Sequence, residues 1–94
     1  MMAKVVEITE DMDAAAMTRL KPVFEDLASG ADDVTLDLTG VDFVDSSGIG
    51  GLVFLYKRLR LAGRQLRLRG AAGQPLQLIR HLRLADLIED GGKA

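Results

Sequence analysis

Cysteine and tryptophan are absent from this chain of 94 residues, and it has one histidine and two prolines. Without cysteine the chain has no disulfide, no thiol nucleophile and no Cys-ligated zinc or iron–sulfur site. One imidazole cannot build a histidine-rich metal site either. The composition therefore predicts a protein without a metal or other cofactor.

Long hydrophobic runs are also missing. The N-terminus has no apolar stretch of signal-peptide length, and the longest run with few charges, residues 44–56, is too short and glycine-rich to cross a bilayer. We therefore expect a cytoplasmic protein that does not insert into a membrane. Hydrophobic residues at 48% and charged residues at 28% are typical of one folded domain. We expect that domain to span residues 1–94, with an ordered core over about 3–89 and mobile residues at 90–94.

Charge is unevenly distributed, although the formal net charge is only −2. Residues 1–45 carry three basic and eleven acidic side chains, whereas residues 46–94 carry nine basic and three acidic ones. Six of the basic residues crowd positions 57–69, which could form a nucleic-acid surface. Because aromatic residues do not interleave with them and the whole chain is acidic, we expect no nucleic-acid partner. An acidic protein partner remains an alternative explanation of the basic stretch.

Three segments have the apolar content or the alternation of β-strands: residues 3–8, 33–38 and 65–69. In the second, Val34, Leu36 and Leu38 share one face, while polar residues occupy the other. A further short apolar run covers 41–44.

Segments with helical spacing of apolar residues lie between the strands. The first follows the acidic cluster 10–13, stops at 29–30 and contains Pro22, where we expect a kink or a late start. The second runs from the serine pair to 62–63. Pro75 is expected to open a third helix that carries His81 at its edge. Alternation of strands and helices predicts an α/β fold with a mainly parallel sheet of about four strands and three to four helices. Sites in such folds lie at the strand-to-helix loops.

One of these loops, residues 45–51, carries the most distinctive motif of the chain. Ser46 and Ser47 lie where the second long helix begins, a position at which a hydroxyl can cap the helix and a phosphate is electrostatically favoured. Either serine could be the cap while the other faces solvent. Three glycines follow within the first two turns, at positions 48, 50 and 51. Glycine weakens a helix, so these positions need a reason, which is either tight packing or close approach by a ligand.

Catalytic and nucleotide-binding motifs do not fit this loop. A dinucleotide fingerprint requires glycine or alanine where Val53 stands, and a Walker loop requires a Gly-Lys pair after four residues, which neither Gly48 nor Gly50 provides. A nucleophile elbow requires glycine in place of Val44, and His81, in a leucine-rich helix, is expected to be a half-buried surface residue and not a base. We therefore expect no enzyme activity.

The segments Val34–Leu38 and Val41–Gly50 together resemble the signature of STAS domains, and most closely that of the bacterial anti-sigma factor antagonists. The likeness extends over about residues 33–89. It implies a small STAS-like α/β fold and a partner-switching protein without an active site. Ser46 is then the phosphorylated serine, with Ser47 the less favoured position.

The resemblance also implies the partners. The unphosphorylated protein binds an anti-sigma factor that is itself a serine kinase, phosphorylation breaks the contact, and a PP2C-type phosphatase restores it. Phosphoserine adds about −1.5 to −2 charges beside Asp45 and close to Asp42, which makes the docking surface repulsive. The residues expected to bind the partner are Asp13, Asp45, Ser46, Ser47, Gly48, Ile49 and Gly50.

The N-terminal part departs from the family pattern. Members of the family usually begin with a pair of strands and a Gly-x-Leu-Asp turn, of which this chain matches only the last half, Met12-Asp13. Asp13 is then either part of the acidic rim near the serine or a simple helix N-cap. A missing first strand leaves an exposed sheet edge, and pairing of two such edges is one route to a homodimer.

A second reading of the same resemblance is an accessory role. Some STAS domains are accessory subunits of ATP-driven (ABC-type) lipid transporters or parts of other signalling complexes, and these relatives are similarly short. The serine pair is the antagonist form of the motif, and therefore favours the partner switch.

Overall fold

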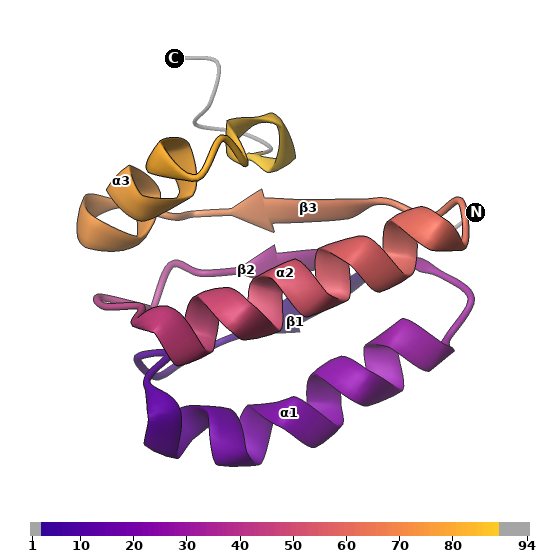
Figure 1. Cartoon of the computed structure of the whole chain (residues 1–94), viewed down its shortest axis with the longest axis horizontal. Helices are drawn as coiled ribbons and strands as arrows, with labels where there is room; N and C mark the ends of the chain where they lie inside the picture. The colour runs from indigo at the N-terminus through magenta and orange to yellow at the C-terminus, as the bar shows by residue number, and fades with distance from the viewer. Residues whose placement is uncertain (1–2, 89–94) are drawn as a thin grey trace.

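The computed structural model describes residues 3–88, which form a parallel sheet with helices between its strands (Figure 1). The strands are β1 (Ala3–Glu7), β2 (Asp33–Asp37) and β3 (Leu66–Arg69), in the order β1-β2-β3. Both pairings are parallel, which confirms the α/β fold with a parallel sheet. Within the described residues the sheet has three strands and not about four, because the run 41–44 forms only one bridge, between Val44 and Met12. A second isolated bridge joins Leu68 to Ile88.

Three α-helices and a short 3₁₀ turn complete the structure: α1 (Ala14–Ser29), α2 (Ser46–Leu61), α3 (Gly73–His81) and η1 (Ala85–Leu87). Helix α1 begins before Pro22 and continues past it, so of the two expected outcomes, a kink or a late start, the late start is wrong. Pro22 is exposed, and it has no N–H to donate to the carbonyl four residues earlier. Helix α3 begins two residues before Pro75, whose buried ring lies in the first turn. The expectation of mobile residues at 90–94 lies outside the described residues.

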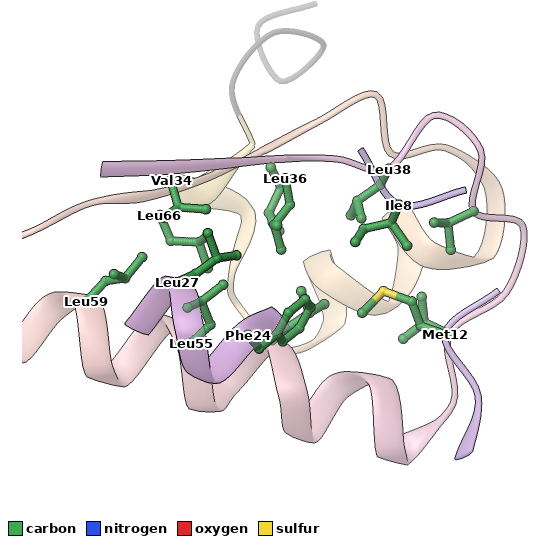
Figure 2. Packing of buried hydrophobic residues seen from close by; sticks show 14 of the residues in the cluster. Ile8, Met12, Phe24, Leu27, Val34, Leu36, Leu38, Leu55, Leu59 and Leu66 are labelled. Atoms are coloured by element: carbon green, nitrogen blue, oxygen red, sulfur yellow. The ribbon is translucent and has the colours of Figure 1, made fainter. Parts of the chain in front are cut away.

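The core lies between one face of the sheet and the helices (Figure 2). The register aligns Val34 with Leu66 and Leu36 with Leu68, so the apolar positions of the two strands form continuous rows. The side chains of β2 and β3 on this face point toward Phe24 and Leu27 of α1 and Leu55 and Leu59 of α2, all of which are buried. Thus the alternation of residues 33–38 predicts the buried face correctly.

The residues that alternate with the core-facing ones along the strands lie on the opposite face of the sheet. Val5, Thr35 and Arg67 are aligned across the three strands on this face, and Val5 is 53% exposed. Among residues 3–88, β1 is an edge strand of the sheet. Homodimer formation through that edge stays a prediction.

Arg64 connects the region after α2 to the C-terminal end of α1. It follows α2 directly, and its guanidinium donates hydrogen bonds to the carbonyls of Leu27, Ala28 and Asp32 at 2.8–2.9 Å. Two of these carbonyls belong to the last turn of α1, which has no basic residue of its own. A cation therefore neutralises the C-terminal end of α1 from a position 36 residues further along the chain.

Candidate functional site

All three α-helices begin at the same edge of the sheet, on the left in Figure 1, where the parallel strands end. Two of the connecting loops are paired there like short strands. The backbone N–H of Met12 donates to the carbonyl of Phe43 (2.9 Å), and the N–H of Asp45 donates to the carbonyl of Met12 (3.1 Å). Asp11 adds a side-chain bond to the N–H of Asp42 at 3.0 Å. The start of α1 and the start of α2 therefore lie side by side.

Asp45, and neither serine, caps helix α2. Its carboxylate accepts hydrogen bonds from the N–H groups of Ser47 (2.8 Å) and Gly48 (3.1 Å). The expectation that a serine hydroxyl caps this helix is wrong, because the carboxylate one residue earlier reaches the same donors and carries a charge that favours the helix N-terminus. Ser46 and Ser47 are consequently both exposed.

Asp13 has the same role in α1, where its carboxylate accepts from the N–H of Ala16 at 2.8 Å. Since Met12 pairs with Val44, the residues that follow them, Asp13 and Asp45, are brought to the same place. The two readings of Asp13 are thus compatible: it is an N-cap, and it belongs to the acidic edge that contains Asp45. Neither role could be assigned from the local sequence alone.

The three glycines of α2 differ in what surrounds them. A Cβ atom at Gly48 would lie 2.5 Å from the carbonyl oxygen of Met12 and 2.8 Å from Cγ1 of Val44, so only glycine fits against the paired loops. A Cβ atom at Gly51 would collide with the end of Met17. Gly50 is different because it is exposed and a Cβ there meets no atom within 4 Å. The packing explanation therefore holds for Gly48, where the contacts are with backbone, and more weakly for Gly51, where the flexible end of Met17 can move; it does not hold for Gly50.

A shallow apolar groove lies between α1 and α2 directly beside the serines. Its volume is about 240 Å³, and its lining includes Met17, Ser47, Gly50 and Phe54, with Lys21 and Glu25 contributed by α1. Phe43, in the loop before Asp45, adds an exposed aromatic ring at 45% exposure. Ile49 is half-buried and packs against the core, so its backbone is better placed than its side chain to contribute to this surface.

Gln74 is a site residue that the sequence did not indicate. Its side-chain amide forms two hydrogen bonds with Val44, accepting from the N–H and donating to the carbonyl, both at 2.9 Å. The amide thereby takes the place of a neighbouring strand and connects the start of α3 to the loop that carries the serines. A glutamine between a loop and a proline has no local signature of such a contact, since its partner lies 30 residues away.

Asp37 ends β2 at the same edge and stabilises the next turn. Its carboxylate accepts from the hydroxyl (2.6 Å) and the N–H (3.0 Å) of Thr39. These two bonds, with a smaller contribution from the Arg69 guanidinium 3.7 Å away, lower the pKa of Asp37 below its ordinary value. Gly70, at φ +78°, lies against this turn, where a Cβ would overlap the Thr39 hydroxyl.

Chemically, the edge presents hydroxyls, carboxylates and backbone groups. Among residues 3–88, no group of three His, Cys, Asp or Glu side chains is arranged to hold a metal ion. His81 is the last residue of α3 and is exposed; the expected half-buried position is wrong. No helix in the described part of the chain is both long and apolar enough to cross a membrane.

The fold has a counterpart among solved structures. A sulfate transporter family protein from Wolinella succinogenes matches with a TM-score of 0.75 over 92% of this chain and 75% of that chain, at 16% sequence identity. At this identity the likeness shows the fold alone. A family model described as "Mlab, STAS domain" matches residues 2–89.

The chain therefore belongs to the STAS domain family. The resemblance noted for residues 34–38 and 41–50 is confirmed, and the family match also includes β1 and α1, which lie before the part that carried the resemblance. No curated protein gives a significant match.

Proposed function

We propose that this STAS domain is a partner-switching protein of the anti-sigma factor antagonist type, controlled by phosphorylation of Ser46. Its partner is an anti-sigma factor with serine kinase activity, and a PP2C-type phosphatase reverses the modification in the cytoplasm. The observation that carries the proposal is the placement of Ser46. It is an exposed serine at the first position of α2, and its hydroxyl is not used to cap the helix, because Asp45 has that role.

Electrostatics support a switch at this position. The paired loops already bring Asp11, Asp13, Asp42 and Asp45 to one edge. A phosphate on Ser46 adds about −1.5 to −2 charges to that edge. The helix N-terminus stabilises the phosphate in the free protein, whereas a partner surface fitted to the neutral hydroxyl meets added repulsion.

Gly50 and the adjacent groove support docking at the same place. Gly50 weakens α2 by about 1 kcal/mol relative to alanine, and no contact within the described chain compensates. Close approach of a partner to the groove lined by Gly50 and Phe54 would explain why position 50 has no side chain. We therefore assign the docking surface to Asp13, Asp45, Ser46, Ser47, Gly48, Ile49 and Gly50, with the groove beside them.

The first experiment is phosphosite mapping by intact-mass spectrometry after incubation of the purified protein with ATP and lysate of its source organism. We expect one phosphate, retained in Ser47→Ala and lost in Ser46→Ala. Binding to the partner isolated from that lysate is then measured for Ser46→Asp and its neutral control Ser46→Asn. A carboxylate at position 46 that meets a negative charge of the partner at about 5 Å costs roughly 1–3 kcal/mol at a protein surface, so Ser46→Asp should weaken binding about tenfold or more. Equal binding of the two variants would refute the electrostatic switch.

A second candidate function is that of a constitutive accessory subunit, on an ABC-type lipid transporter or in another signalling complex. It is favoured by the match to the family model described as "Mlab, STAS domain", and the matched solved structure is that of a sulfate transporter family protein. In that case Ser46 stays unmodified and Ser46→Asn and Ser46→Asp both retain the partner. The mapping and binding experiments above therefore distinguish the two candidates.

A further inference from the structure

A second pocket lies at the opposite end of α2, away from Ser46. Its volume is about 390 Å³, and it is formed by the C-terminal half of α2, the start of β3 and η1, with a lining that includes Tyr56, Arg60, Gln65, Arg67, Asp86 and Leu87. Ser46 and Arg60 are 14 positions apart on one helix, which corresponds to about 21 Å. A ligand here does not touch the phosphorylation site.

Two of the arginines in this pocket are available to a ligand. Arg64 also lines the pocket, but its guanidinium is already bound to three backbone carbonyls. Arg60 and Arg67 are exposed, and neither takes part in an ion pair among residues 3–88. Their charges are therefore not neutralised within the described part of the chain.

Both available guanidiniums are held in place by neutral neighbours. Arg60 donates to the hydroxyl of Tyr56 at 2.7 Å, and Arg67 donates to the side-chain oxygen of Gln65 at 2.9 Å. Each neighbour occupies one donor and leaves the other N–H groups of the guanidinium free. Arginine fixed in this way loses less rotamer entropy when it binds a carboxylate, and it can form two parallel hydrogen bonds with it.

We propose that this pocket is a second docking site, which binds an acidic segment of a partner protein. Carboxylates of the segment pair with Arg60 and Arg67, while an apolar side chain of the segment contacts Leu87 on the pocket wall. Charge complementarity favours this occupant, since the described lining of the pocket carries three arginines and one aspartate.

A nucleic acid fits the same features less well. Asp86 lines the pocket and repels a continuous phosphate backbone. Tyr56, the one aromatic residue in the described lining, is already engaged by Arg60. An acidic peptide can place its separate carboxylates on the two arginines and leave a neutral residue against Asp86. The occupant that fits this pocket best is therefore a protein segment and not DNA, RNA or an anionic membrane.

The test is fluorescence anisotropy with a labelled peptide of about eight residues that alternates leucine and glutamate, at low ionic strength. The reference peptide has glutamine in place of glutamate. The full-length protein is compared with the double variant Arg60→Gln/Arg67→Gln and with the matched control Lys57→Gln/Arg58→Gln, which removes the same charge from exposed residues outside the pocket. Circular dichroism establishes that the variants are folded, and the single variants Arg60→Gln and Arg67→Gln are measured alongside.

We expect the wild type to bind the glutamate peptide and not the glutamine peptide. The Kd should rise at least tenfold in Arg60→Gln/Arg67→Gln and less than threefold in the control. Ser46→Asp should leave the Kd within twofold, which separates this site from the proposed switch. Equal losses in both double variants, or no binding by the wild type, would overturn the proposal. Tighter binding of a single-stranded oligonucleotide of equal charge, lost with the same two arginines, would reassign the pocket to nucleic acid.

Discussion

Alanine at Gly48 and alanine at Gly50 should change stability in opposite directions, although the two positions are two residues apart on the same helix. At Gly48 the new Cβ would lie 2.5 Å from the carbonyl oxygen of Met12 and 2.7 Å from its Cβ. Both are too close for real atoms, and neither belongs to the flexible end of a side chain. Helix α2 must therefore move away from the paired loops, or the loops must separate.

The different surroundings of Gly48 and Gly50 set the expected changes in the free energy of unfolding. Overpacking of this kind costs typically 1–3 kcal/mol, and the gain in helix propensity from glycine to alanine offsets up to about 1 kcal/mol. Because the clash at Gly48 is with backbone atoms, the cost lies at the upper end of this range, and we expect Gly48→Ala to lower the free energy of unfolding by roughly 1–2 kcal/mol. Gly50→Ala meets no atom within 4 Å and should raise it by about 0.5–1 kcal/mol. For a domain of this size each kcal/mol shifts the Tm by about 4–8 °C.

Urea and thermal unfolding followed by circular dichroism at 222 nm measure both effects without any partner. In addition, Gly50→Ala should weaken partner binding while the protein becomes more stable, because its methyl group projects into the proposed interface. A Gly48→Ala protein as stable as the wild type would refute the packing argument. Unchanged partner binding by Gly50→Ala would remove Gly50 from the docking surface.

Three further perturbations test individual contacts. Gln74→Ala should cost about 2 kcal/mol and speed amide hydrogen exchange at Val44, since both backbone groups of Val44 lose a partner; unchanged exchange would contradict the strand-like role of this amide. Arg64→Met keeps the apolar stem but leaves three carbonyls unpaired, so the urea midpoint should fall by the equivalent of about 2–3 kcal/mol. Because folding lowers the pKa of Asp37, the stability from its ionised form is complete above its ordinary value of 3.8 and is lost as the pH falls through the lower folded value. Asp37→Asn should flatten this acid-side dependence in urea titrations, whereas an unaltered dependence would show that the Thr39 bonds contribute nothing.

Patterns of period two and 3.6 were sufficient to predict most of the fold. The alternation at 33–38 and 65–69 predicted strands that face the core correctly, because burial on one face is a local property of the sequence. The sequence predicts about four strands, whereas the described residues form three, since the apolar run 41–44 is too short to pair beyond Val44. An apolar run predicts burial, which is correct for Val41 and Val44, but it does not predict a ladder.

The sequence indicated the loop of the candidate site but not the contacts that form it. The motif identified the loop and the exposed serines, yet it could not decide between Asp45 and a serine as the cap, because both residue types bind the same N–H groups. It also could not separate Gly48 from Gly50, since the difference lies in atoms of Met12, far away along the chain. Gln74 was missed for the same reason.

The paired loops have a consequence for how Ser46 is recognised. The loop before Ser46 is held by Met12 on one side and by Gln74 on the other, so residues from three distant parts of the chain fix one short segment. A free peptide with the sequence of residues 41–51 has none of these supports. An enzyme that recognises this geometry therefore modifies the folded domain and passes over nascent or unfolded copies. In the proposed switch, phosphorylation of Ser46 would then report only on folded molecules, which are the ones able to bind the partner.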